Sequence, residues 1–367
     1  MQSGRSSQPF AKRPGGDNGA AKRRASALAR LGIALTLAPM EAALVEELPK
    51  EAGWQFEPKW DGFRCLAFRA GSEAEIKAKS GKSLSRFFPE VLENLLALPT
   101  QNLVLDGELV IPIEGELSFD ALQMRLHPTD SRIRKLARET PAMFVAFDCL
   151  LRESGMPLLA RSFHERRREL ETFFARDHKG LSLTPFTRDL RKAKSWLARR
   201  QLALDGVMAK RLDLIYKPGE RAMRKVKRMR TAECVVGGFR YASKERLVGS
   251  LLLGLYDDAA LLHHVGFTSA ISNDDKPALT ARLEKLIDPP GFTGDAPGGP
   301  SRWSTDRSAE WQPLRPKLVV EVRYDHVTSN RFRHGTRLVR WRPDKSPRQC
   351  TFDQLAKPSA ALASLWK

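Results

Sequence analysis

The stretch of this 367-residue chain with the clearest potential for chemistry is EPKWDGFR, residues 57–64. Lys59 stands just before a glycine turn that opens a strand pattern, with an acid two residues later and an arginine five residues later. A lysine amine becomes a nucleophile when neighbouring cations or partial burial lower its pKa from about 10.4. An isolated lysine is a solvated surface charge, so the nucleophile hypothesis for Lys59 depends on what the rest of the chain supplies.

The elements that must position this lysine follow from hydrophobic periodicity. Short apolar, β-branched or aromatic runs bounded by turn residues predict strands at 63–68, 103–111, 143–151 and 206–210. Apolar residues at helical spacing predict helices at 85–98, 162–174 and 189–204. Strands separated by irregular helices and long loops do not form a regular βαβ repeat. We therefore predict an α+β fold with antiparallel or mixed sheets.

The pattern changes after about residue 231. Closely spaced strands are expected at 232–241, 249–256 and 260–267, then a helix at 273–287, a Gly/Pro-rich loop at 288–300, and strands at 318–324 and 338–341. Five short strands with one helix fit a small β-barrel such as an OB-fold.

Four segments are therefore expected along the chain. Residues 1–30 contain seven Lys and Arg among Gly, Ser, Ala and Pro with Asp17 as the single acid, a composition typical of a disordered basic tail. A mixed domain is expected at 31–230, the barrel at 231–355 and a C-terminal tail at 356–367.

Composition narrows the class of partner. Lys and Arg number 62 against 43 Asp and Glu, a net charge of +19, which points to a polyanionic partner. The chain has no run of about 18 apolar residues and no signal-peptide core, so we expect a cytoplasmic, nucleoid-associated protein with no membrane partner. Its four cysteines form no CxxC pair, which disfavours a zinc ribbon or a disulfide framework and predicts buried free thiols.

KWDGFR, residues 59–64, resembles the KxDGxR motif of the covalent nucleotidyltransferases, a superfamily of ATP-dependent DNA ligases, RNA ligases and mRNA capping enzymes. Further stretches resemble the later motifs of that superfamily in the expected order: LDGEL at 105–109, FVAFD at 144–148, DGVMAK at 205–210 and KVK at 225–227. The chain is most similar to ATP-dependent DNA ligases of the bacterial ligase C type, on EPKWDGFR, RFFPE at 86–90, ALQMRLHP at 121–128, RTAECVVGG at 230–238, VEVRYD at 320–325 and RWRPDK at 340–345.

This resemblance implies a nucleotidyltransferase core followed by an OB-fold barrel, with ATP and Mg²⁺, or Mn²⁺ in its place, as cofactors. It implies that Lys59 attacks the α-phosphate of ATP, that AMP passes to the 5′-phosphate of a nick, and that the 3′-OH then seals the strand. Positioning and charge neutralisation supply most of the catalysis in such phosphoryl transfers.

The resemblance also assigns the remaining site residues. The expected nucleotide-binding residues are Glu57, Arg64, Glu108, Phe147, Lys225, Lys227, Arg342 and Lys345. Glu108 and Asp205 are the expected metal ligands, since each stands beside a glycine that leaves room for a ligand and carboxylates suit magnesium. Phe147 is expected to stack on adenine, although an aromatic residue in a strand is otherwise a core residue. Ser80 and Lys82 are the expected DNA-binding residues.

The chain departs from the family pattern at two positions. Asp205 stands where the family has Glu, so its carboxylate is one methylene shorter. Ser80 is followed by Gly81 and Lys82, whereas the family has Arg directly after the serine to grip the nick. A lysine offers a point charge without the bidentate contact of arginine.

The cations Arg342 and Lys345 belong to a second basic segment, 331–348. By resemblance they orient the pyrophosphate leaving group when the barrel closes on the nucleotide, and reopening then exposes a DNA-facing surface. A static DNA-binding patch is the competing hypothesis.

The function predicted from sequence is an ATP-dependent DNA ligase that seals nicks in duplex DNA during repair. The alternatives are an RNA ligase, an RNA-tolerant nick ligase or a capping guanylyltransferase of the same superfamily, and, more remotely, a non-catalytic basic OB-fold binder of nucleic acid. An NAD-dependent bacterial ligase is disfavoured because its four-cysteine zinc module is absent. Nicked duplex DNA is the expected partner, with Ku or a primase-polymerase as candidate protein partners, and the protein is expected to be a monomer.

Overall fold

The computed structural model describes residues 26–198, 204–243, 245–298 and 310–355. Most of the expected basic tail and the whole C-terminal tail lie outside these ranges. Residues 26–30 are part of the folded structure: the 3-10 helix η1 (Leu28–Arg30) begins where Glu73 accepts the backbone N–H groups of Ala27 and Leu28.

The N-terminal part contains a five-stranded sheet in the order β4-β3-β5-β8-β9. Its strands are β3 (Phe63–Ala70), β4 (Glu73–Ala78), β5 (Asn102–Val110), β8 (Met143–Leu151) and β9 (Leu181–Leu183). All neighbours are antiparallel except β8 and β9, which are parallel. The sheet is thus of the mixed kind predicted from the sequence.

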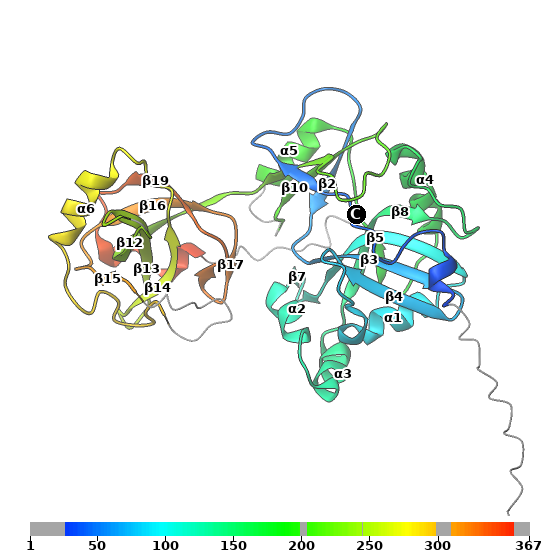
Figure 1. Ribbon diagram of the computed structural model, residues 1–367, viewed down its shortest axis with the longest axis horizontal. Helices are drawn as coiled ribbons and strands as arrows, with labels where there is room; N and C mark the ends of the chain where they lie inside the picture. The colour runs from blue at the N-terminus through cyan, green and yellow to red at the C-terminus, as the bar shows by residue number, and fades with distance from the viewer. Residues whose placement is uncertain (1–25, 199–203, 244, 299–309, 356–367) are drawn as a thin grey trace, which may run out of the picture.

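A second, four-stranded sheet packs beside the first in the order β1-β11-β10-β2 (Figure 1). It consists of β1 (Ala42–Leu44), β2 (Trp54–Lys59), β10 (Gly206–Arg211) and β11 (Met223–Lys227). A core cluster that includes Phe56 and Val207 of this sheet and Val110 and Val145 of the other joins the two. The interface between the sheets therefore fixes the end of β2, where Lys59 lies.

Among the residues that the structure describes, five α-helices accompany the two sheets. They are α1 (Pro89–Leu96), α2 (Phe119–Arg125), α3 (Asp130–Glu139), α4 (Phe163–Phe173) and α5 (Leu190–Ala198), with the 3-10 helix η2 (Ser85–Phe87) and the short strands β6 (Pro112–Ile113) and β7 (Glu116–Leu117). The helix expected at 85–98 is divided at Phe88, because the residue before a proline is driven out of the helical region, and Phe88 has φ −132° and ψ 59°.

The C-terminal part is the β-barrel expected from the spacing of its strands (Figure 1). Its main sheet has the order β14-β13-β12-β16-β19, with β15 paired to β12. The elements are β12 (Arg230–Tyr241), β13 (Val248–Tyr256), β14 (Leu262–Thr268), α6 (Lys276–Glu284), β15 (Gln312–Pro313), β16 (Val319–Tyr324), β17 (Val327–Thr328), β18 (Arg331–Phe332), β19 (Arg337–Trp341), η3 (Pro347–Gln349) and η4 (Phe352–Leu355).

A bulge bends the long strand β12 at Gly237 and Gly238, where its pairing register with β13 shifts. A Cβ atom at Gly237 would lie 2.7 Å from the ring of Phe292, so only glycine lets the strand curve over this core residue.

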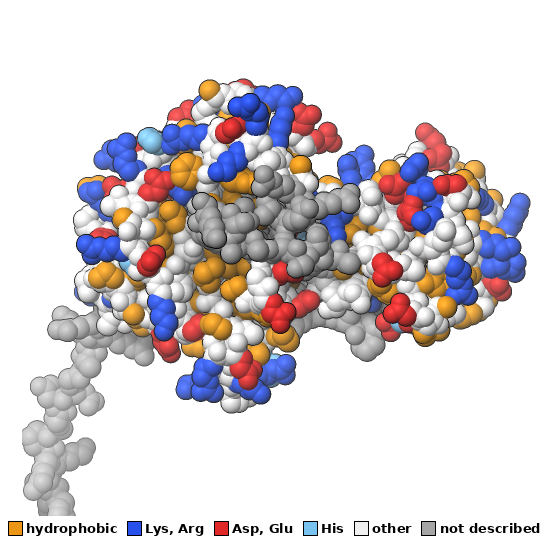
Figure 2. Space-filling model, turned by 180° about the vertical axis from the view of Figure 1, so that it is seen from behind, with side chains coloured by type: hydrophobic (Ala, Val, Ile, Leu, Met, Phe, Trp, Pro, Cys, Tyr) orange, Lys and Arg blue, Asp and Glu red, His pale blue; other side chains and the backbone are white. Residues whose placement is uncertain are grey.

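Cys65, Cys149, Cys234 and Cys350 are buried and free, as predicted. None of the helices in the described ranges combines the length and apolarity needed to cross a bilayer. Figure 2 shows Lys and Arg side chains on both parts of the molecule on the face that it presents, so the positive charge is not confined to one part.

Candidate active site

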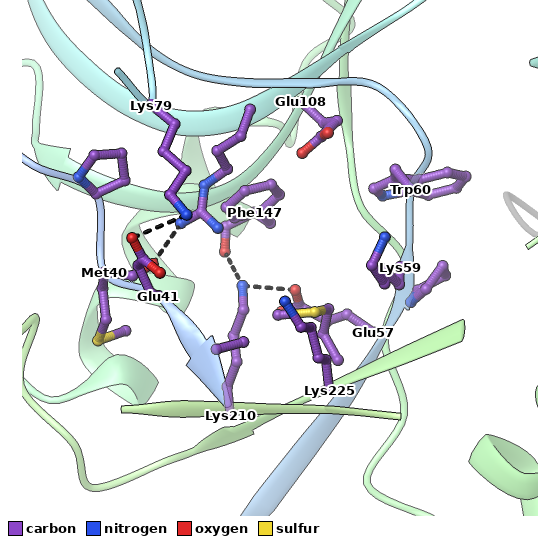
Figure 3. Close-up of a pocket in the computed structure, with 15 residues that line it drawn as sticks. Met40, Glu41, Glu57, Lys59, Trp60, Lys79, Glu108, Phe147, Lys210 and Lys225 are labelled. Carbon is purple, nitrogen blue, oxygen red and sulfur yellow. Dashed lines mark hydrogen bonds and ion pairs between the residues drawn. The ribbon is translucent and has the colours of Figure 1, made fainter. Parts of the chain in front are cut away.

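A cavity of about 190 Å³ opens between the two sheets of the N-terminal part (Figure 3). Six residues predicted from the sequence line it: Glu57, Lys59, Arg64, Glu108, Phe147 and Lys225. Lys79 and Lys210 also line it, so the cavity wall is rich in cations and suits an anionic ligand.

Lys59 is the last residue of β2 and pairs with Gly206 of β10. Asp205, one residue earlier, donates its backbone N–H to the carbonyl of Lys59, and its Oδ2 accepts a hydrogen bond from Lys59 Nζ at 2.6 Å. Burial alone would lower the pKa of Lys59, but the charge of Asp205, with smaller contributions from Glu108 and Asp61, raises it above its ordinary value. The sequence hypothesis required a lowered pKa at Lys59, whereas the charge of Asp205 in this structure raises it.

Glycine is required on both sides of this contact. A Cβ at Gly206 would lie 2.1 Å from the carbonyl oxygen of Val226, so β10 and β11 can approach only at a glycine. A Cβ at Gly62 would lie 2.2 Å from the carbonyl oxygen of Leu109. The glycines of the two DG pairs therefore let the backbone pack closely around Lys59 and Asp205.

Glu108 lies on β5 and faces the cavity. Burial raises its pKa to about 7 in spite of the opposing charges of Lys59 and Arg64. No hydrogen bond or ion pair to its carboxylate is present among the described residues. The expected role of Glu108 and Asp205 as metal ligands stays a prediction, because the two Asp205 oxygens already contact Lys59 and His326.

Lys225 and Lys227 alternate on β11, as predicted. Burial lowers the pKa of Lys225, and the charges of Lys59 and Lys227 lower it further. Lys225 thus lies among like charges in the cavity wall, a setting that suits an anionic ligand. Lys227 forms an ion pair at 2.5 Å with Asp325, which follows β16.

Phe147 and Arg64 lie together in the cavity wall. The Arg64 guanidinium is 4.7 Å from the ring centroid of Phe147 and donates two hydrogen bonds to Asp106. Lys210 Nζ lies 4.4 Å from the same centroid. The ring is only 8% exposed, so its stacking on adenine stays a prediction.

Glu57 is buried beside this ring. Its carboxylate lies 2.7 Å from Lys210 Nζ and accepts a hydrogen bond from Gln55 (Figure 3). Lys210 ends the DGVMAK motif, but the spacing of that motif does not reveal that Lys210 pairs with Glu57.

The structure does not bring all predicted residues to the cavity. Ser80 and Lys82 are exposed in the turn after β4, where Gly81 has φ +78°. Arg342 and Lys345 both pair with Glu233 of the barrel itself, Lys345 at 2.8 Å. In this conformation the two barrel cations therefore lie away from the nucleotide cavity.

Two other barrel residues, His326 and Arg333, reach the site, although neither was among the residues expected there from the sequence. His326 Nε2 lies 2.7 Å from Asp205 Oδ1, and Arg333 donates to Asp61 at 2.7 Å. The signals in the sequence were that Asp325 ends the family-like stretch VEVRYD with His326 directly after it, and that Arg333 lies in the basic segment 331–348. Asp61, Asp205 and His326 form a group of the kind that holds metal ions, but Lys59 and Arg333 already neutralise its carboxylates.

The fold and the site together define a nucleotidyltransferase core with an OB-fold domain after it. Residues 36–227 match the ATP dependent DNA ligase domain, and residues 244–345 match the ATP dependent DNA ligase C terminal region. The chain belongs to the family of ATP-dependent DNA ligases. This confirms the family, the fold class and the enzyme activity predicted from the sequence.

Individual relatives agree with the family assignment. DNA ligase C2 of Mycolicibacterium smegmatis is 44% identical over 338 residues, which cover 88% of this chain and 95% of that protein. The non-homologous end joining DNA repair protein LigD of Mycobacterium tuberculosis is 31% identical over 308 residues, 81% of this chain and 37% of that protein. A solved structure from work on Lig E DNA ligases shares the fold, with TM-score 0.52 and 17% identity, over 83% of this chain and 99% of that one.

Proposed function

We propose that Lys59 carries the adenylate in this ligase. The main support for this proposal is the position of the Lys59 amine, which lies at the edge of a cation-lined cavity and 2.6 Å from Asp205 Oδ2. The Lys59 ammonium first loses a proton to water, and the amine nitrogen then attacks the α-phosphorus of ATP. The bond to pyrophosphate breaks, pyrophosphate leaves, and a second N–H proton passes to water as the Lys59–AMP bond forms. AMP then passes from Lys59 to the 5′-phosphate of a nick, and the 3′-OH displaces it to seal the strand.

The residues around Lys59 have distinct tasks in this scheme. Lys225 and Lys227 neutralise the transferring phosphate, Arg64 contacts the ribose, and Phe147 and Glu57 receive the adenine. The buried carboxylate of Glu57 would accept a hydrogen bond from the exocyclic amine of adenine. Guanine has no amine at that position of its ring. This supports ATP over GTP.

Glu108 and Asp205 would hold Mg²⁺, which supplies charge neutralisation at the phosphates when bound. The carboxylate oxygens suit this ion, and a bound cation would offset the burial that raises the pKa of Glu108 to about 7. Asp205 also provides a resting partner for the Lys59 amine.

The cellular setting belongs to the same proposal. The name of the relative LigD places that protein in end joining and DNA repair. We infer that this chain acts on nicks left by repair, at the nucleoid, where Ku or a primase-polymerase would hand over the DNA. Ser80 and Lys82, in an exposed turn, would contact the nicked duplex.

The test is sealing of a duplex with one 5′-phosphorylated nick. ATP with Mg²⁺ should give sealed strand, whereas GTP, NAD or ATP with a chelator should not. Sealing with GTP alone would contradict the proposed base recognition. A matched nick with RNA at the 3′ side measures the tolerance for ribonucleotides.

A further inference from the structure

A structured loop of the barrel, residues 325–333, lies against the candidate active site. Asp325 pairs with Lys227, His326 with Asp205 and Arg333 with Asp61. The loop contains the hairpin of β17 and β18, and Arg333 donates its backbone N–H to the carbonyl of His326 at 3.0 Å. These contacts are thus made by a structured element.

The barrel core anchors this loop. Phe332 is buried against Tyr324, with ring centroids 4.7 Å apart, and Arg331 contacts His264 Nδ1 at 2.8 Å. Figure 1 shows β17 on the side of the barrel toward the N-terminal part. The anchoring fixes where the imidazole of His326 meets the carboxylate.

The loop does not obstruct the nucleotide. None of the described barrel residues lines the cavity that holds Lys59, Glu108 and Phe147. At the same time Arg342 and Lys345 are held by Glu233. This conformation therefore leaves the nucleotide pocket free while the cations expected to serve lysine adenylation are turned away.

Both oxygens of Asp205 are engaged, Oδ2 by Lys59 and Oδ1 by His326. Once Lys59 carries AMP, its nitrogen is part of a phosphoramidate and is no longer an ammonium. The ion pair with Oδ2 is then lost, whereas the contact of His326 with Oδ1 can persist.

We propose that His326 is a positioning residue for Asp205 in the steps that follow adenylation of Lys59. This rests on the proposed function of Lys59. The imidazole Nε2, 2.7 Å from Oδ1, holds the carboxylate in its orientation while AMP passes to the nick and the nick is sealed. Lysine adenylation starts from the arrangement in which Lys59 pairs with Asp205, so we expect this step to depend much less on His326.

The experiment separates the steps in the full-length protein. His326→Ala, His326→Gln and the control His263→Ala are compared for labelling by α-labelled ATP and for single-turnover sealing of a nick that already carries a 5′-adenylate. His263 is a matched control because two carboxylates hold it in the barrel, at 3.0 and 3.1 Å, and it makes no contact with Asp205.

The rate at which His326→Ala is labelled by ATP should stay within about twofold of the wild-type rate. Its rate of sealing the adenylated nick should fall on the order of 10- to 100-fold, the range seen when a residue that orients a functional side chain is removed. His326→Gln, which keeps a donor near the ε position, should recover most of the rate. The proposal would be overturned if His326→Ala lost the same factor in both assays or sealed at the wild-type rate. It would also be overturned if His326→Gln did not restore the sealing rate. Failure of the wild-type protein to label would instead count against the proposed role of Lys59.

Discussion

Lys59 Nζ lies 2.6 Å from Asp205 Oδ2, and this contact holds the proposed nucleophile as an ammonium. An ammonium has no lone pair with which to attack phosphorus. The Lys59–Asp205 pair must therefore weaken, and Lys59 must lose a proton, before the amine can attack ATP.

The Asp205→Asn variant should lower the pKa of Lys59, because burial then acts without the opposing carboxylate charge. We expect the midpoint for reaction of the Lys59 amine with an amine reagent, measured without ATP, to move to lower pH by about one unit or more. Asp213→Asn, at an exposed pair with Arg211, is the control. An unmoved midpoint would show that Asp205 does not set the pKa.

Arg342→Ala and Lys345→Ala should slow lysine adenylation by about 100-fold, because each removes a charge from the leaving pyrophosphate. Sealing of a nick that is already adenylated should continue. Glu233→Gln should leave adenylation intact or raise its rate, since both cations now pair with Glu233. Normal adenylation by Arg342→Ala and Lys345→Ala would favour the static DNA-binding patch.

Lys82→Ala should weaken binding to nicked duplex DNA without changing adenylation. Loss of one phosphate contact should reduce the slope of log K against log salt by about one. Lys82→Arg should bind more tightly because arginine grips phosphate with two donors. Lys50→Ala, another exposed lysine, is the control. Equal salt slopes for wild type and Lys82→Ala would remove Lys82 from the DNA path.

His264 should make the protein less stable in acid. Burial, together with Arg331 and Arg240, lowers the pKa of His264 from 6.5 to about 3. Between these values the unfolded chain binds a proton that the folded chain does not, so the free energy of unfolding falls as the pH drops, by about 1.4 kcal/mol per pH unit.

Urea unfolding followed from pH 7 to pH 4 measures this effect. His264→Gln should flatten the dependence below pH 6.5, whereas His127→Gln, in the loop after α2, should keep it. The same slope in wild type and His264→Gln would assign the acid sensitivity to other groups.

Sequence reasoning located most strands because their patterns are local. The run at 143–151 coincides with β8, and 206–210 falls within β10 (Gly206–Arg211). It missed β2 (Trp54–Lys59), whose Glu57, Pro58 and Lys59 do not look like a strand and are held there by pairing with β10. The expected helix at 273–287 is shorter, Lys276–Glu284, because Pro277 favours a start in the first turn.

The site was predictable only where one motif supplies its residues. The alternation of Lys225 and Lys227, and the clustering of Glu57, Lys59 and Glu108, follow from strand geometry and family resemblance. The contact of Asp205 with His326 joins residues far apart in the chain and depends on how the barrel packs. Hydrophobic periodicity carries no information on such packing.

The most direct test of the account is to find where the adenylate is attached. The protein is incubated with Mg²⁺ and α-labelled ATP, digested under alkaline conditions, and the labelled peptide is identified. We predict an acid-labile label on the peptide that contains Lys59, and no label on a folded Lys59→Arg variant. Label that persists in Lys59→Arg, or that lies on another lysine such as Lys225 or Lys210, would contradict the account.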